Sequence, residues 1–160
     1  QETVDVNRCL DTTLSMLSGK ISNGVCIQKD YADLPAVTCY LREMNQVFFN
    51  IMLNALQAIG PHGRLTLSTR ACGDGWVEVG ISDTGPGIQA KSMARIFEPF
   101  YTTRQVGEGI GLGLYLAHNI VKSHNGTIDV ESKEGLGSTF RVKIPLEGST
   151  GSIGSGNIES

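Results

Sequence analysis

Residues 76–88 read WVEVGISDTGPGI, and this stretch decides the fold. Its first six residues alternate, a period typical of a half-buried β-strand. The strand ends at Asp83, and the glycines and the proline of residues 84–88 turn the chain after it. The stretch therefore predicts a sheet strand that presents a carboxylate at its end, followed by a loop with little side-chain bulk.

The residues before this strand predict a hairpin and a long helix. Residues 65–69 also alternate, and a Gly73-Asp74-Gly75 turn joins them to the strand at 76–81 as a hairpin. Apolar residues recur at intervals of three and four across 41–59, where a helix is expected to end at Gly60-Pro61. Further predicted elements are a helix over 6–18, a strand over 25–27 and an extended piece over 35–40.

The residues after the strand complete a two-layer architecture. A helix is predicted from Leu112 to Ser123, and strands over 127–132 and 138–144 then pair across a glycine turn. Adjacent strands join by tight turns and do not alternate strictly with helices. The expected fold class is therefore α/β, a two-layer α/β sandwich with a mixed, mostly antiparallel sheet covered on one face by helices.

The length and composition indicate one cytoplasmic domain. The chain has 160 residues, enough for a single core, which we expect over 1–146, while the Gly- and Ser-rich residues 147–160 are expected to be a flexible tail or a scar of cloning. A net charge of −3 argues against general nucleic-acid binding. Since no apolar run approaches the ~18 residues of a membrane span, we expect no membrane contact by this domain, although a parent protein can still be membrane-anchored. The four cysteines lack a CxxC pair, which favours reduced core cysteines over a zinc site.

Two asparagines share a face of the helix predicted over 41–59. Asn50 and Asn54 lie four residues apart. Amide oxygens are neutral hard ligands that suit Mg²⁺ when phosphate and water complete its coordination. Taken alone, hydrogen bonds from both amides to neighbouring loops are the simpler interpretation.

Asp83 and the loop after it also have two interpretations. Aspartate commonly shapes such turns. A carboxylate here would also accept a hydrogen bond from the adenine amino group, whereas guanine would present an acceptor, and Gly85 and Gly87 would let the backbone approach a purine closely. The run Gly85-x-Gly87-x-x-Ala90 matches the loose dinucleotide fingerprint as well, but Pro99 interrupts the crossover helix which that fold requires.

A run of alternating glycines leads into the helix predicted from Leu112. These glycines are Gly107, Gly109, Gly111 and Gly113. Backbone amides in such a loop, with the positive end of a helix behind them, bind anions without any net basic charge. The plainer alternative is a flexible glycine-rich loop, and the P-loop signature GxxxxGK[ST] is absent.

Four motifs follow one another in a recognisable order. They are Asn50-x-x-x-Asn54-Ala55, Asp83-Thr84-Gly85-Pro86-Gly87-Ile88, Phe97-Glu98-Pro99-Phe100-Tyr101-Thr102-Thr103 and Gly107-x-Gly109-x-Gly111-Leu112-Gly113-Leu114. In this order they resemble the N, G1, F and G2 boxes of the sensor histidine kinase catalytic domain, and Gly137-Ser138-Thr139-Phe140 resembles its closing strand motif. The resemblance covers about residues 4–146 and implies the Bergerat fold.

The resemblance implies a site for ATP and Mg²⁺. Asn54 would be the Mg²⁺ ligand, with Asn50 beside it near the phosphates. Asp83 would hold the adenine amino group, with Thr139 helping through water. Phe97 and Phe100 would anchor a mobile lid. The other residues implied to contact nucleotide are Gly85, Gly87, Ile88, Thr102, Thr103, Arg104, Gly107, Gly109, Gly111, Leu112, Gly113 and Leu114, and Asn50 and Arg104 would serve catalysis.

The resemblance also implies the reaction and the partners. The γ-phosphate would pass to a histidine on a separate dimerisation domain, with a response regulator downstream. Related ATPases place Glu at the position of Asn50 to activate water, and because an amide cannot take that proton, we expect slow hydrolysis. Many family members carry Lys at the position of Gln57, so a phosphate contact is expected to be weaker here. A degenerate module that only senses ATP is the alternative.

The chain's own histidines do not resemble phosphoacceptors. His62 lies beside Pro61 in a predicted turn, while His118 and His124 lie within and near the end of the second helix. We therefore expect all three to be turn, surface or helix-end residues, with the acceptor outside this chain.

Overall fold

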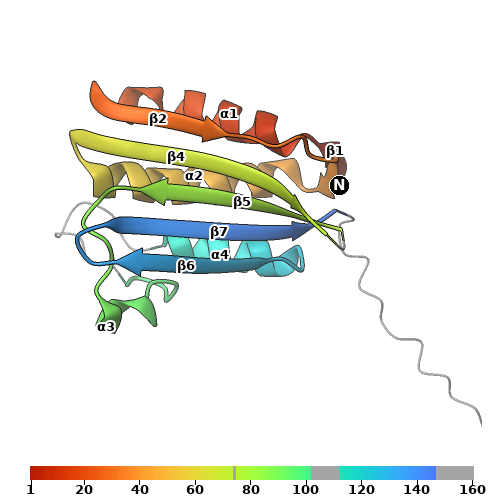
Figure 1. Cartoon of the computed structure of the whole chain (residues 1–160). Helices are drawn as coiled ribbons and strands as arrows, with labels where there is room; N and C mark the ends of the chain where they lie inside the picture. Colours follow the sequence, from red (N-terminus) through yellow and green to blue (C-terminus); the bar gives the residue numbers. More distant parts are fainter. Residues whose placement is uncertain (74, 102–111, 147–160) are drawn as a thin grey trace, which may run out of the picture.

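A five-stranded sheet carries the fold, and helices cover one of its faces (Figure 1). The computed structural model describes residues 1–73, 75–101 and 112–146. The strands lie in the order β2-β4-β5-β7-β6, and β2 and β4 are parallel while the other neighbours are antiparallel. This confirms the mixed, mostly antiparallel sheet. The strands are β2 Gly24–Asp30, β4 His62–Cys72, β5 Trp76–Asp83, β6 Thr127–Lys133 and β7 Gly137–Pro145.

The helices follow the predicted amphipathic segments closely. They are α1 Val6–Met16, α2 Leu41–Ile59, the short α3 Ala90–Met93 and α4 Gly113–Ser123, with a 3₁₀ turn over Ser18–Lys20. Asp5 caps α1 by accepting the Arg8 N–H, and Gly60 ends α2 with a positive φ of 69°. The bounds of α2 are those predicted from its apolar spacing.

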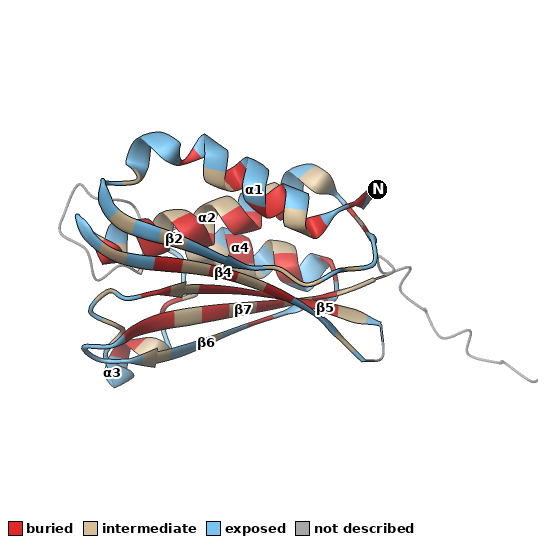
Figure 2. Cartoon of the chain, turned by 45° about the horizontal axis from the view of Figure 1, so that its top comes forward, coloured by how far each residue is buried: buried red, intermediate tan, exposed pale blue. Residues whose placement is uncertain are grey.

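The core lies between the sheet and the helices (Figure 2). Every second residue of the central strands faces it, and each of these apolar side chains is at most 1% exposed. Full burial of such a side chain stabilises the fold by roughly 1.5–3 kcal/mol. The residues concerned are Val77, Val79 and Ile81 on β5 and Phe140, Val142 and Ile144 on β7.

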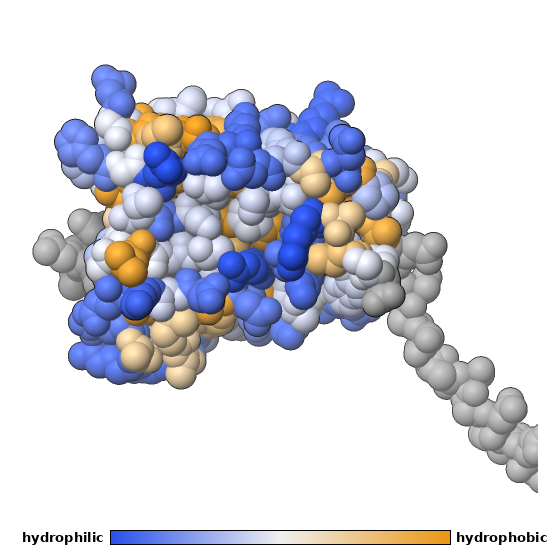
Figure 3. All heavy atoms as spheres, viewed as in Figure 1, coloured by the Kyte–Doolittle hydropathy of each residue, from blue (hydrophilic) through white to orange (hydrophobic). Residues whose placement is uncertain are grey.

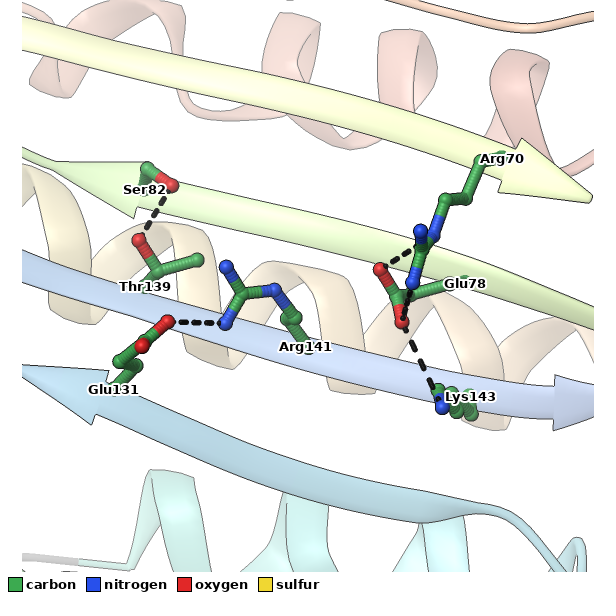
Figure 4. Close-up of polar contacts among 7 residues, drawn as sticks. All are labelled: Arg70, Glu78, Ser82, Glu131, Thr139, Arg141 and Lys143. Carbon is green, nitrogen blue, oxygen red and sulfur yellow. Dashed lines mark hydrogen bonds and ion pairs between the residues drawn. The ribbon is translucent and has the colours of Figure 1, made fainter. Parts of the chain in front are cut away.

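The opposite face of the sheet is mostly polar, with scattered apolar side chains (Figure 3). Glu78 points to this face and is nevertheless 8% exposed. The Arg70 guanidinium donates two hydrogen bonds to the Glu78 carboxylate, of 3.0 and 3.1 Å. The Lys143 Nζ lies 3.9 Å from the same carboxylate (Figure 4). Arg70 and Lys143 therefore neutralise the charge of Glu78 on the outer face of the sheet.

Several local features differ from the sequence-based expectations. A separate two-stranded sheet joins β1 Glu2–Val4 to β3 Val37–Cys39 and was not predicted. His62 begins strand β4 and does not lie in a turn. Cys9 and Cys39 are buried as expected, but Cys26 is exposed and Cys72 half-buried because each lies on the strand face away from the helices.

The described part of the chain contains no helix that is long and apolar enough to cross a membrane. The predicted tail, residues 147–160, lies outside the described residues, so the domain boundary at 146 stays a prediction.

Candidate nucleotide site

Asp83 lies at the end of β5, nearly buried. The residue is 6% exposed, and its Oδ1 accepts the Gly85 N–H at 2.9 Å. Burial raises the pKa of this carboxyl, against the opposing effect of hydrogen bonds from the Gly85 and Ser138 backbone amides. Asp83 therefore shapes its turn, as the simpler interpretation proposed, and it also keeps a poorly solvated carboxylate at the end of the strand.

Ser138 and not Thr139 shares the sheet face of Asp83. In the β5–β7 register Asp83 is opposite Ser138, and Ser82 is opposite Thr139. Successive side chains point to opposite faces, so Thr139 lies on the polar outer face, where its Oγ1 is 2.8 Å from the Ser82 Oγ (Figure 4). This placement contradicts the prediction that Thr139 assists Asp83 with adenine.

The loop from Asp83 to Ile88 is fastened to the neighbouring elements on both sides. The Thr84 Oγ1 accepts the Arg64 N–H at 2.9 Å, and Pro86 accepts the Gly135 N–H at 2.7 Å. The Ile88 N–H donates to the Ser132 Oγ at 2.7 Å. The loop is therefore held to neighbouring elements at three points along its length.

The two loop glycines serve this packing. A Cβ on Gly85 would lie 2.8 Å from the Ala58 carbonyl oxygen of α2, and one on Gly87, whose φ is 75°, would overlap the Lys133 carbonyl. We predicted that these glycines make room for a purine. The structure gives a different reason, since the space that each side chain would need is filled by protein backbone.

We expect Gly87→Ala to lower the free energy of unfolding by more than Gly135→Ala. Both residues have positive φ, 75° and 83°, but nothing lies within 4 Å of a Cβ on Gly135. Each variant should lose roughly 1–2 kcal/mol from the left-handed backbone, and only Gly87→Ala should lose more through the overlap with Lys133. Urea unfolding of both variants measures the difference, and equal losses would contradict the packing role of Gly87.

Asn50 connects α2 to the start of α4. Its Nδ2 donates to the Gly113 carbonyl at 3.1 Å, and its Oδ1 accepts the Gln46 Nε2 at 2.7 Å. The helix-linking bond agrees with the simpler interpretation of Asn50. Asn54 lies one turn further along, half-buried and with interactions of its own. Both amide side chains therefore already interact with neighbouring groups.

One face of α2 connects the two halves of the predicted site. Asn50, Asn54 and Ala58 follow at intervals of one turn, so they line a single face over about 12 Å. Asn50 contacts Gly113 at one end, and Ala58 lies against Gly85 at the other. The amide pair thus lies between the Asp83 loop and the start of α4.

The predicted anion site lies at the start of α4. Its N-cap residue, Leu112, makes no side-chain capping hydrogen bond. The first amides of a helix have no partner within the helix and attract negative charge. Leu114 packs partly buried against the core, which fixes this end of the helix.

The F-box motif is divided between a packed and an exposed phenylalanine. The Phe97 ring packs 5.2 Å from the His118 ring and 6.4 Å from the Phe140 ring. Phe100 is 72% exposed with a φ of 64°. Phe97 is placed to anchor the segment that follows it, whereas the exposure of Phe100 among the described residues gives its predicted anchoring role no support.

Six predicted contact residues lie outside the described residues. They are Thr102, Thr103, Arg104, Gly107, Gly109 and Gly111. Their assignments remain predictions, as does the lid.

The structure confirms one of the two positions expected for His124, the end of the second predicted helix. It is 3% exposed, and its ring Nδ1 lies 2.9 Å from the Ile120 carbonyl while Nε2 accepts the Tyr40 N–H at 3.3 Å. His124 does end α4 as expected, but it is not a surface residue because its ring joins α4 to the first residue before α2. His118 is half-buried and His62 exposed.

The residues present fit a nucleotide that brings Mg²⁺ with it. Among residues 1–73, 75–101 and 112–146, no group of three or more His, Cys, Asp or Glu side chains could hold a metal alone. Amide oxygens on α2 can complete the coordination of an ion that is already bound to phosphate. The donor set therefore suits Mg-nucleotide better than free metal.

An α/β sandwich with these motifs on α2, after β5 and at the start of α4 has the architecture of the histidine kinase ATP-binding domain. Residues 40–148 match the family described as "Histidine kinase-, DNA gyrase B-, and HSP90-like ATPase", and the chain belongs to this family.

Named relatives and solved structures agree. The sensor histidine kinase ZraS of Escherichia coli is 39% identical over 148 residues, which are 91% of this chain and 31% of that protein. The catalytic domain of histidine kinase ThkA has a TM-score of 0.76 at 27% identity, over 92% of this chain and 97% of that one. Full-length ShkA in complex with AMPPNP has a TM-score of 0.82 at 27% identity, over 92% of this chain and 31% of that one. The chain therefore spans about a third of the relative ZraS.

Proposed function

We propose that this chain binds Mg-ATP and donates the γ-phosphate to a histidine on a separate dimerisation domain of a sensor kinase. The observation that carries the proposal is the single face of α2, which has Asn50 against Gly113 at one end and Ala58 against Gly85 at the other. Adenine would lie by Asp83, and the phosphates would lie by the amides and the start of α4. The similarity to histidine kinases supports the same reaction.

Each group of residues has a physical task in this proposal. Asp83 accepts from the adenine amino group, Asn54 offers its amide oxygen to Mg²⁺, and the first amides of α4 neutralise phosphate charge. The bound Mg²⁺ would supply electrostatic stabilisation of the transferring phosphoryl group. Asn50 lacks a basic atom, and its amide is already bonded to Gly113 and Gln46, so water is not activated and an external nucleophile is favoured.

The acceptor would come from a partner. All three histidines of the chain are described, and none combines exposure with a helical position: His62 begins a strand, His118 stacks on Phe97, and His124 is buried. We infer a histidine-bearing dimerisation domain as the substrate and a response regulator as the next acceptor, with the domain itself in the cytoplasm.

Calorimetric titration with ATP, ADP and GTP, with and without Mg²⁺, tests the binding half of the proposal. ATP should bind more tightly than GTP, and Mg²⁺ should strengthen ATP binding. Equal affinity for ATP and GTP would contradict the adenine assignment. A pure nucleotide sensor would pass this titration but would label no supplied histidine domain.

Addition of Mg²⁺ should increase ATP affinity, and we expect Asn54→Ala to reduce this increase by at least about tenfold. Losses of this size are typical when a group that supports a metal is removed. Affinity in EDTA should change little, because the adenine contacts remain. Arg42→Ala is the matched control: it lies on the same helix, three turns before Asn54, is exposed, and should alter either affinity by no more than about twofold. A loss of equal size with and without metal would mean that Asn54 only holds the fold together.

A further inference from the structure

The Ser132 hydroxyl, which belongs to none of the motifs, lies at the centre of a hydrogen-bond cluster with residues of two of them. Its Oγ receives the Ile88 N–H at 2.7 Å, lies 2.8 Å from the Ser138 Oγ, and donates to the Gly137 carbonyl at 3.1 Å. Ser132 comes from β6, whereas the three groups come from the loop after Asp83 and from β7. One hydroxyl therefore connects the Asp83 loop to the β6–β7 hairpin.

The chemistry of a hydroxyl fixes the direction of these bonds. Ser132 has one proton and two lone pairs. All three contacts are hydrogen bonds only if the proton goes to the Gly137 carbonyl and the lone pairs accept from Ile88 and from the Ser138 hydroxyl. Ser138 is then the donor to Ser132, and the free lone pairs of its own oxygen become acceptors.

Ser138 lies where such acceptors matter. It is opposite Asp83 in the sheet register, 7% exposed, and on the same face. The site would then offer two acceptors side by side, the Asp83 carboxylate and the Ser138 oxygen. Such a pair favours a base that presents an amino group over one that presents a carbonyl.

We propose that Ser132 is a positioning residue of the nucleotide site, which holds the Asp83–Ile88 loop in place and turns the Ser138 hydroxyl so that its oxygen accepts from adenine. The inference rests on the proposed function, because it assumes that adenine lies beside Asp83. Ser132 itself would not touch the nucleotide.

The test compares Ser132→Ala with Ser132→Thr, which keeps the hydroxyl, in calorimetric titrations with ATP and GTP. Ser132→Ala should weaken ATP binding by roughly five- to tenfold, the effect of one lost buried hydrogen bond, and should lower the ratio of ATP to GTP affinity. Ser132→Thr should restore most of both. Thr139→Ala is the matched control, since its hydroxyl lies on the outer face with Ser82.

The outcomes separate the two hypotheses. If the parent chain does not prefer ATP, the proposed function and this inference both fail. If the parent prefers ATP and Ser132→Ala keeps the same ratio, Ser132 has no positioning role. If Ser132→Ala does not fold, Ser138→Ala is measured instead. It removes the oriented acceptor, and an unchanged ATP to GTP ratio in that variant would overturn the inference.

Discussion

Replacing Asp83 with asparagine is expected to weaken ATP binding by about ten- to a hundredfold, the worth of a lost charge-assisted hydrogen bond. Asparagine keeps the shape of the side chain but can present an NH₂ group where adenine needs an acceptor. Calorimetric titration of the variant with Mg-ATP measures the loss. Binding as tight as that of the parent would remove Asp83 from the adenine site.

The fold should not suffer in this variant, which makes the result specific. Burial raises the pKa of Asp83, so stability falls as the pH rises from the ordinary carboxyl pKa through the folded-state pKa, and above it the full cost of the buried charge remains. Asp83→Asn removes the charge, and its melting temperature at neutral pH should be equal to or above that of the parent. A melting temperature below that of the parent would mean that the weaker ATP binding reflects a less stable fold.

The same raised pKa predicts how ATP affinity depends on pH. Only the ionised carboxylate accepts fully from adenine, so affinity is complete above the folded-state pKa of Asp83 and falls as the pH drops through it. The acid-side fall that comes from this group should be absent in Asp83→Asn. Identical pH profiles for parent and variant would show that another group titrates.

His124→Ala is expected to lower the free energy of unfolding by about 2–4 kcal/mol, through a buried cavity and the loss of the ring's hydrogen bonds. The ring bonds the Ile120 carbonyl and the Tyr40 N–H and packs 5.8 Å from the Tyr40 ring. Its removal unties the end of α4 from the start of α2. Urea unfolding of the parent and the variant measures the loss.

The control for this variant is His62→Ala. His62 is exposed at the start of β4, and surface substitutions usually change stability by no more than about 0.5 kcal/mol. Equal effects of the two substitutions would contradict the account of His124 as a link between α2 and α4.

The sequence predicts the sheet, the long helix and the order of the motifs because these depend on local patterns. The period of three and four gives α2 its observed bounds, Leu41–Ile59, and alternation gives the hairpin of β4 and β5. The alternation of residues along β7 also shows that Ser138, and not Thr139, lies on the face of Asp83. Phe140, Val142 and Ile144 are the apolar residues of β7, so the even-numbered residues, Ser138 among them, face the core, and Thr139 does not.

Contacts between distant residues could not be predicted in this way. Tyr40 and His124 are separated by 84 residues, and no local period indicates that they meet. The pairing of β1 with β3 joins two strands of three residues each, too short for alternation to be informative. The close approach of Gly85 to Ala58 depends on how the loop packs on α2, so the reason for the glycine was clear only from the structure.

The most direct test of the central claim is incubation of the chain with γ-labelled ATP and Mg²⁺, alone and with the histidine-bearing hairpin domain of the proposed parent kinase. Alone, the chain should release phosphate very slowly and should not label itself, because Asn50 cannot deprotonate water. With the hairpin domain, it should transfer the label to histidine, and the product should be stable in base and labile in acid. Rapid multi-turnover release of phosphate by the chain alone, with no label on the hairpin domain, would contradict the account and indicate an ATPase.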